Sequence, residues 1–204
     1  MHLGQDVFDR LKGYDHFNKG QVGFPDISLI GLTKRLLNFR KISCAAVNGF
    51  AVGGAANIAL FLTDFCFCSK TSFFMYPFAD RGVPPELGSS LLLPLAVGVS
   101  RAKHWFMTGE KLTSSVAVEL GLVKAAFEDD KLIEGVVAFA KQFADAKNYP
   151  GRVLAKLSVN ETLLKMLETT ETLDRENKSF LASTSSEYFK KVTKLLLHSI
   201  KPKI

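Results

Sequence analysis

The feature that most constrains the fold is an uncharged stretch, residues 42–63, that two pairs of turn-forming residues interrupt. Asn48-Gly49 is a strong turn signal, and Gly53-Gly54 would weaken any helix through the middle of the stretch. A membrane span needs about 20 apolar residues, so length alone would allow one here. Because of the interruptions we predict a strand, a turn and a buried helix instead, and no membrane span.

The hydrophobic pattern on both sides of this stretch alternates strands with helices. Strands are expected over residues 43–47, 65–68, 72–76 and 122–127, and helices over 26–39, 53–62, 89–97, 101–107 and 113–121. Beyond residue 129 the pattern is helical, with helices expected over 130–147, 151–168, 171–182 and 185–198. This order predicts an α/β body, residues 1–129, followed by a helical region, residues 130–204.

Charge and cysteine content exclude several classes of protein. The formal net charge is +6, but residues 1–127 hold 13 basic and 9 acidic residues and residues 128–204 hold 13 and 11, so no nucleic-acid partner is indicated. The tail from Tyr188 holds five lysines and no acidic residue, and it could be a solvated helix face or could contact an anionic ligand. Cys66 and Cys68 alternate in an apolar run without a nearby His, which predicts buried thiols and no metal site.

Two residues are candidates for chemistry. A Gly-Gly pair that opens a helix leaves backbone N–H groups uncovered, so the N–H of Gly54 could bind a ligand oxygen as part of an oxyanion hole. The pair could equally serve only close helix–strand packing. Glu86 lies between Pro85 and Leu87, where desolvation would raise the pKa of its carboxyl toward that of a general base. An acid in a loop is often only solvated, so the prediction for Glu86 depends on its meeting Gly54.

Three runs of sequence carry a resemblance to a known family. They are SCAAVNGFAVGGAANIALFLTDF at 43–65, TSFFMYPFADRGVPPELGSSLLLPLAVG at 71–98 and TGEKLTSSVAVELGLV at 108–123. In order and spacing they resemble the enoyl-CoA hydratase/isomerase (crotonase) superfamily. The resemblance implies a crotonase-like ββα spiral with a C-terminal helical trimerisation region, and hence a homotrimer or hexamer. It also implies an acyl-CoA thioester substrate, no cofactor besides the coenzyme A of that substrate, and the backbone N–H of Gly54 in the oxyanion hole.

Departures from the hydratase pattern narrow the implied reaction. The resemblance places the two hydratase carboxylates at the positions of Asn57 and Phe78, and neither side chain can transfer a proton. The loop around Glu86 resembles that of Δ3,Δ2-enoyl-CoA isomerases, especially the fungal peroxisomal type, in which this Glu is the single catalytic residue. We therefore expect Glu86 to move a proton from C2 to C4 of the acyl chain while Gly54 stabilises the enolate. Tyr76, Phe78 and Leu87 are the expected substrate-binding side chains.

The resemblance also predicts a missing part. In this family a second oxyanion donor precedes the first described motif, and here Met1-His2-Leu3 resembles only the end of that segment. We therefore expect the first strands of the spiral to be absent from this sequence. The alternative is a short, non-catalytic crotonase-fold subunit that binds acyl-CoA or a protein partner. The expected compartment is the peroxisome, with the mitochondrion as the alternative.

Overall fold

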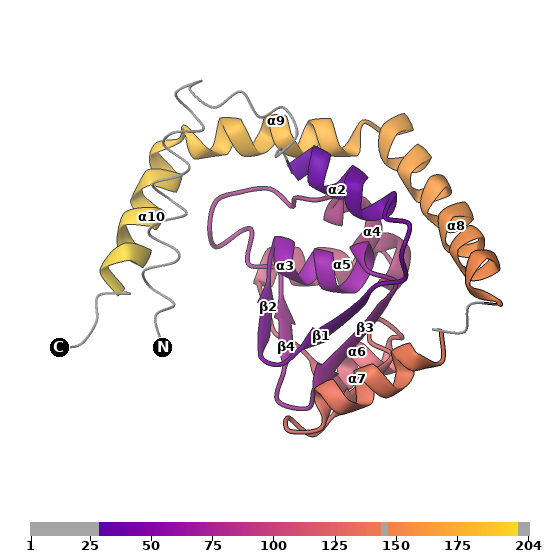
Figure 1. Ribbon diagram of the computed structural model, residues 1–204. Helices are drawn as coiled ribbons and strands as arrows, with labels where there is room; N and C mark the ends of the chain where they lie inside the picture. The colour runs from indigo at the N-terminus through magenta and orange to yellow at the C-terminus, as the bar shows by residue number, and fades with distance from the viewer. Residues whose placement is uncertain (1–28, 144–146, 200–204) are drawn as a thin grey trace.

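The computed structural model describes residues 29–143 and 147–199, and in this part of the chain the strands form two small sheets (Figure 1). The first sheet has the order β1-β3-β6, all parallel. The second has the order β2-β4-β5, with β2 and β4 parallel and β5 antiparallel to β4. The strands are β1 (Cys44–Val47), β2 (Phe50–Val52), β3 (Phe65–Ser69), β4 (Phe73–Met75), β5 (Leu112–Thr113) and β6 (Ala125–Phe127).

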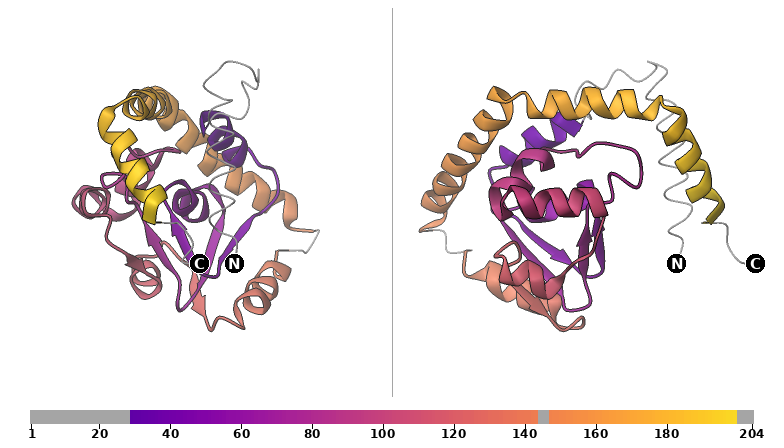
Figure 2. Two further views of the ribbon diagram at one scale, coloured as in Figure 1. Left: turned by 90° about the vertical axis from the view of Figure 1, so that its left-hand side faces the viewer. Right: turned by 180° about the vertical axis from the view of Figure 1, so that it is seen from behind.

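Helices surround these sheets. They are α2 (Leu29–Leu37), α3 (Gly54–Asn57), which continues into the π-helical turn η1 (Ile58–Leu62), α4 (Ser89–Val97), α5 (Val99–Thr108), α6 (Ser114–Glu119), α7 (Leu132–Lys141), α8 (Tyr149–Thr169), α9 (Thr172–Thr184) and α10 (Glu187–Ser199). The last three follow one another in an arch around the sheets, and α2 lies between this arch and the core (Figures 1 and 2). The arch therefore brings residues from the end of the chain over the loops that follow β2 and β4.

The predicted α/β order followed by helices is confirmed, and the uncharged stretch forms the expected strand, turn and helix, with a short strand, β2, between the turn and the helix. Two short strands, β2 and β5, were not predicted, because segments of three and two residues are too short to show an alternating pattern. The predicted strand over 122–127 begins only at Ala125, since the N–H groups of Leu122 and Val123 bond to the carbonyl oxygen of Ala117 instead.

The core explains the aromatic and cysteine pattern of β3. Cys66 and Cys68 are buried on the side of the strand that faces β4 and α5, whereas Phe67 packs on the other side with α7. This alternation is the period of two that a strand imposes on its side chains. Both thiols are buried, as predicted, and burial raises the pKa of the Cys66 thiol to about 12 and that of Cys68 to about 11.

A buried ion pair fastens α8 to the core. Lys156 Nζ lies 2.8 Å from Asp64 Oδ2, and the same oxygen accepts hydrogen bonds from the backbone N–H and the hydroxyl of Ser43. Farther along α8, Asn160 Nδ2 donates to the carbonyl oxygen of Leu37 at the end of α2. These contacts fix α8 on the core, and therefore also the place where α9, the next helix of the arch, crosses the core.

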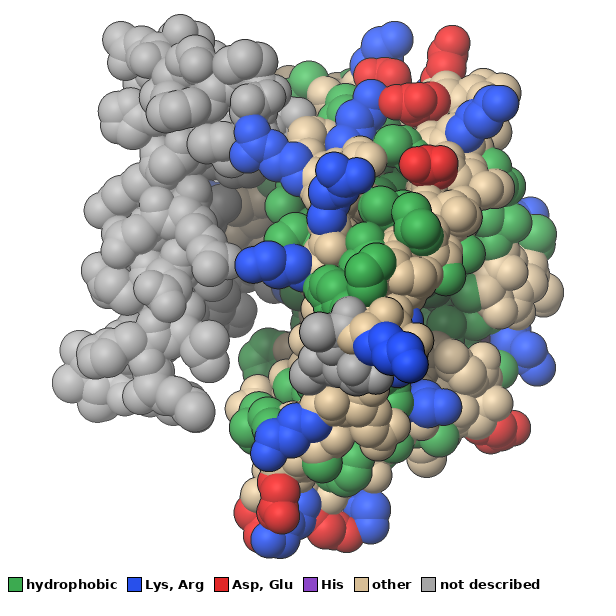
Figure 3. All heavy atoms as spheres, turned by 45° about the vertical axis from the view of Figure 1, so that its right-hand side comes forward, with side chains coloured by type: hydrophobic (Ala, Val, Ile, Leu, Met, Phe, Trp, Pro, Cys, Tyr) green, Lys and Arg blue, Asp and Glu red, His purple; other side chains and the backbone are tan. Residues whose placement is uncertain are grey.

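One face of the surface agrees with a dispersed charge. On the face that includes α8, Lys and Arg side chains are spread among hydrophobic and acidic ones without forming one continuous patch (Figure 3). In the described ranges, no helix has both the length and the apolar character that a membrane crossing requires. The last residues of the basic tail, Lys201 and Lys203, lie outside the described residues.

Candidate active site

The site begins at the turn between β2 and α3. Gly53 has a φ of +59° and a ψ of −124°, a backbone conformation that suits glycine, and its N–H donates to the carbonyl oxygen of Met75 at the end of β4. This turn lets α3 begin at Gly54. Since the first N–H groups of a helix have no partner inside it, the N–H of Gly54 can bond outward. It donates to Glu86 Oε1 over 3.2 Å.

Position 54 requires a glycine because the loop that carries Glu86 lies too close for a side chain. A Cβ atom on Gly54 would lie 2.7 Å from Glu86 Oε1 and 2.8 Å from Leu87 Cδ1. The packing explanation offered for the Gly-Gly pair is thus correct in part, but the close neighbour is the loop carrying the candidate base. Two residues that are 32 positions apart in the sequence meet as predicted.

The environment of Glu86 favours a neutral carboxyl more than water does. Burial raises the pKa of Glu86 above its ordinary value of 4.5, the hydrogen bond from Gly54 lowers it, and the nearby charge of Glu176 raises it further. Burial is the largest of these effects, so the pKa is raised overall. A carboxylate with a raised pKa is a stronger base than an exposed one, and its acid form can return the proton.

A cavity of about 540 Å³ opens in front of the pair. Its wall includes Gly54, Phe78 and Glu86 from the core, and Phe180 and Phe189 from α9 and α10. Among the described residues that line it, Glu86 is the only carboxylate, and one basic side chain, that of Arg81, is present. A mostly apolar wall with one acid and one base suits an acyl chain that carries a polar end.

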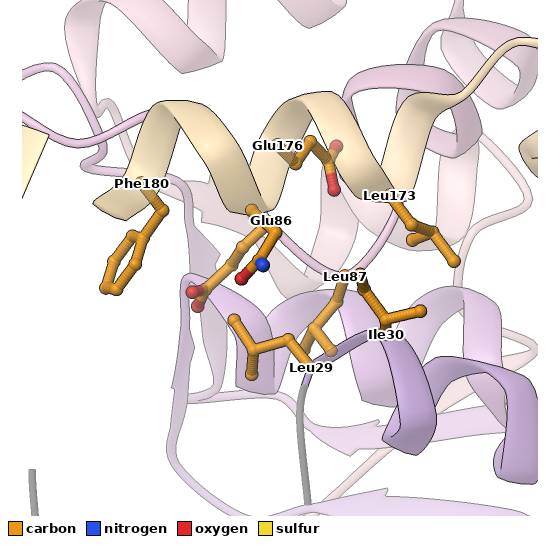
Figure 4. A pocket seen from close by; sticks show the side chains of 8 residues that line it. Leu29, Ile30, Glu86, Leu87, Leu173, Glu176 and Phe180 are labelled. Atoms are coloured by element: carbon orange, nitrogen blue, oxygen red, sulfur yellow. The ribbon is translucent and has the colours of Figure 1, made fainter. Parts of the chain in front are cut away.

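The predicted substrate-binding residues are placed differently from one another. Phe78 lines the large cavity, as expected for a residue that shapes an acyl pocket. Tyr76 is fully buried and packs in the core against Phe78 and Phe106, so it does not reach the cavity wall. Leu87 is also buried, beside a narrow second pocket between the Glu86 loop, α2 and α9 (Figure 4).

Several residues of the site were not found from the sequence. Phe180, Phe189 and Glu176 come from the C-terminal helices, and Figure 4 shows Glu176 and Phe180 projecting from α9 toward the Glu86 loop. Asn57, which had no predicted role, is fully buried and donates to the carbonyl oxygen of Leu87 over 2.6 Å. Met1-His2-Leu3, which resembles the end of the segment that carries the second oxyanion donor, lies outside the described residues.

Fold and site together define an α/β protein in which a helix-terminal N–H and one half-buried carboxyl face an apolar cavity. Residues 5–199 match the family described as enoyl-CoA hydratase/isomerase, so the chain belongs to that family. The fold is the crotonase-like one that the sequence predicted. Enzymes of this family generally need no cofactor besides the coenzyme A of their substrate.

Curated relatives and solved structures agree with this assignment. A protein of Rhizobium meliloti (strain 1021) described as a probable enoyl-CoA hydratase is 34% identical over 134 residues, which cover 66% of this chain and 51% of that protein. The 1,2-epoxyphenylacetyl-CoA isomerase of Escherichia coli (strain K12) is 29% identical over 165 residues, 81% of this chain and 62% of the relative. The chain thus spans about half to three fifths of these relatives. The enoyl-CoA hydratase/isomerase structure from Pseudoalteromonas atlantica T6c superposes with a TM-score of 0.78 at 30% identity, covering 90% of this chain and 71% of that one.

Proposed function

We propose that the chain is a Δ3,Δ2-enoyl-CoA isomerase, which shifts the double bond of an unsaturated fatty acyl-CoA. The observation that carries this proposal is the presence of one carboxylate, Glu86, among the described residues that line the large cavity. Moving a double bond needs one group that takes a proton and returns it two carbons away. It does not need a second acid to position a water molecule, and the described part of the cavity wall supplies none.

In the structure the N–H of Gly54 donates a hydrogen bond to Glu86. In this mechanism the thioester oxygen of the substrate replaces Glu86 as the acceptor of that hydrogen bond. Loss of that hydrogen bond removes an interaction that lowers the pKa of Glu86, so substrate binding makes the carboxylate a stronger base. Glu86 then removes a proton from C2, and the resulting enolate oxygen is stabilised by Gly54. When the same carboxyl protonates C4, the electron pairs shift to give the 2-enoyl thioester.

Hydration is the second candidate, because the relative in Rhizobium meliloti bears the name of a hydratase. The two positions that would carry the hydratase carboxylates argue against it. Asn57 is fully buried with its amide on Leu87, and Phe78 presents only an aromatic ring to the cavity. Neither residue has a carboxyl group that could activate a water molecule or donate a proton to the substrate.

The product distinguishes the two reactions. Incubated with a 3-enoyl-CoA, the protein is expected to form the 2-enoyl-CoA, measured by chromatography and mass spectrometry, because one carboxylate suffices for the shift. Incubated with the 2-enoyl-CoA, the protein is expected to form 3-hydroxyacyl-CoA at least about 100-fold more slowly than it isomerises the 3-enoyl-CoA. The reason is that hydration lacks a second proton-transfer group, which contributes about that factor or more. Rapid hydration would contradict the proposal, and tight acyl-CoA binding without turnover would favour the non-catalytic subunit.

Three further parts of the proposal rest on the family resemblance. The substrates would come from fatty acid β-oxidation, the chain would assemble as a homotrimer or hexamer, and its compartment would be the peroxisome or, alternatively, the mitochondrion. Gel filtration with light scattering tests the assembly, and microscopy of the tagged protein tests the compartment.

A further inference from the structure

One peptide group next to Glu86 is held from both sides by side chains of two distant helices. Asn57 Nδ2, on α3, donates to the carbonyl oxygen of Leu87 over 2.6 Å. The N–H of Gly88 donates to Glu176 Oε2, on α9, over 2.7 Å. Since the carbonyl of Leu87 and the N–H of Gly88 belong to the same peptide unit, its two polar ends are both fixed.

This peptide lies in a part of the backbone that needs external support. Leu87 has a φ of +58°, in the left-handed region where residues with a Cβ are unfavourable, and Gly88 follows with a φ of +80°. Such a conformation persists when surrounding contacts determine it. Leu87 directly follows Glu86 in the chain, so this left-handed turn sets the direction in which the Glu86 side chain leaves the backbone.

Glu176 makes an extensive contact with this turn. Its Oε1 atom accepts hydrogen bonds from the backbone N–H of Ser90 at 3.0 Å and from the Ser90 hydroxyl at 2.6 Å. Its side chain is buried, and the burial of a carboxylate is costly unless hydrogen bonds compensate for the lost water. The hydrogen bonds of the Glu176 carboxylate thus hold the segment that follows Glu86, at the start of α4.

Neither side chain lines the large cavity. Asn57 is fully buried beneath the loop, and Glu176 reaches only the narrow pocket behind Glu86 (Figure 4). Both can therefore act on the reaction only through the position and surroundings of Glu86. We propose that Asn57 and Glu176 form a peptide clamp on Leu87–Gly88 that aims Glu86 at the substrate, which makes α9 part of the positioning machinery. The peptide clamp rests on the function proposed for Glu86.

The charge of Glu176 gives the peptide clamp a signature that a purely structural contact lacks. Among the described residues lining the two pockets that Glu86 borders, the other charged side chains are Glu176 from α9 and Arg81 from the same loop as Glu86. The negative charge of Glu176 raises the pKa of Glu86. Because Glu86 acts as a carboxylate, removing this charge extends the active form to lower pH.

The test compares Glu176→Gln and Glu176→Ala with the matched control Asp174→Asn, which alters an exposed acid on the same helix. Gln keeps the shape of the side chain but loses the charge and one acceptor, so we expect kcat to fall about tenfold and the acid limb of the kcat–pH profile to move to lower pH. Ala frees the loop, and kcat is expected to fall roughly 100-fold, the effect of about 1 Å of misplacement. KM should change much less, and the control should match the unaltered protein.

Amide hydrogen exchange reports on the peptide clamp without any assay of turnover. The N–H groups of Gly88 and Ser90 are expected to exchange faster in Glu176→Ala and in Asn57→Ala, but not in the control. Activity is counted per folded molecule, determined from circular dichroism and thermal unfolding. If the unaltered protein does not isomerise 3-enoyl-CoA, the proposed function fails. If it does, and both Glu176 variants keep its kcat and its pH profile, the peptide clamp is refuted.

Discussion

Replacing Glu86 by Gln is expected to lower kcat for the isomerisation of 3-enoyl-CoA by about 1,000-fold, the middle of the range for general acid–base catalysis. The amide has the size of the carboxyl, and its oxygen can still accept the N–H of Gly54, so the cavity keeps its shape. KM should therefore change little. Steady-state kinetics with a 3-enoyl-CoA measures both constants.

Stability separates the loss of a base from the loss of the fold. The pKa of Glu86 is raised in the folded state above its ordinary 4.5, so the folded protein holds this proton more tightly than the unfolded chain does. Its contribution to stability is full below pH 4.5 and is lost as the pH rises through the folded-state pKa. Glu86→Gln, which stays neutral, should be at least as stable as the unaltered protein at neutral pH, as thermal unfolding can measure.

The matched control for this variant is Glu119→Gln, which changes an exposed acid at the end of α6. It should leave kcat, KM and the melting temperature unchanged, because surface substitutions away from such a site have small effects. An unchanged rate in Glu86→Gln would show that another group transfers the proton.

Replacing Gly54 by Ala is the second change with a large expected effect. The new Cβ would lie 2.7 Å from Glu86 Oε1 and 2.8 Å from Leu87 Cδ1, so the loop or the helix start must move. That movement separates the base from the N–H that stabilises the enolate. We expect kcat to fall at least about 100-fold, the lower end of the cost of losing one oxyanion donor.

Gly49→Ala is the matched control for Gly54→Ala. It introduces the same methyl group in the turn before β2, where a Cβ would have no neighbour within 4 Å. Its kcat should stay near that of the unaltered protein. Equal activity of the two alanine variants would remove the N–H of Gly54 from the mechanism.

The pairing of Gly54 with Glu86 was predictable because local chemistry marks both positions. A glycine pair at a helix start and an acid set between a proline and a leucine are visible in the sequence, and the motifs around them resemble one family. The strand β1 was also predictable in kind, since its apolar run ends at the turn signal Asn48-Gly49. These features depend on residues that are neighbours in the chain, so the sequence alone is enough to recognise them.

The contribution of the C-terminal helices could not be predicted in the same way. Glu176 lies in the polar run TLDRENKSFLAST, where nothing distinguishes it from the exposed Asp174, and it is buried only because the arch brings α9 over α4. Tyr76 and Phe78 show the converse problem. Both follow the end of β4 at Met75, where the strand alternation no longer tells which ring faces a cavity and which enters the core.

The central claim is that a single carboxyl carries the proton from C2 to C4. It is tested most directly with a 3-enoyl-CoA that is deuterated at C2, converted in ordinary water under single-turnover conditions and analysed by NMR. We predict deuterium at C4 of the 2-enoyl-CoA product, because Glu86 removes the label and returns it before all of it exchanges. A product whose C4 hydrogen comes entirely from water, or a 3-hydroxyacyl-CoA product, would contradict the account.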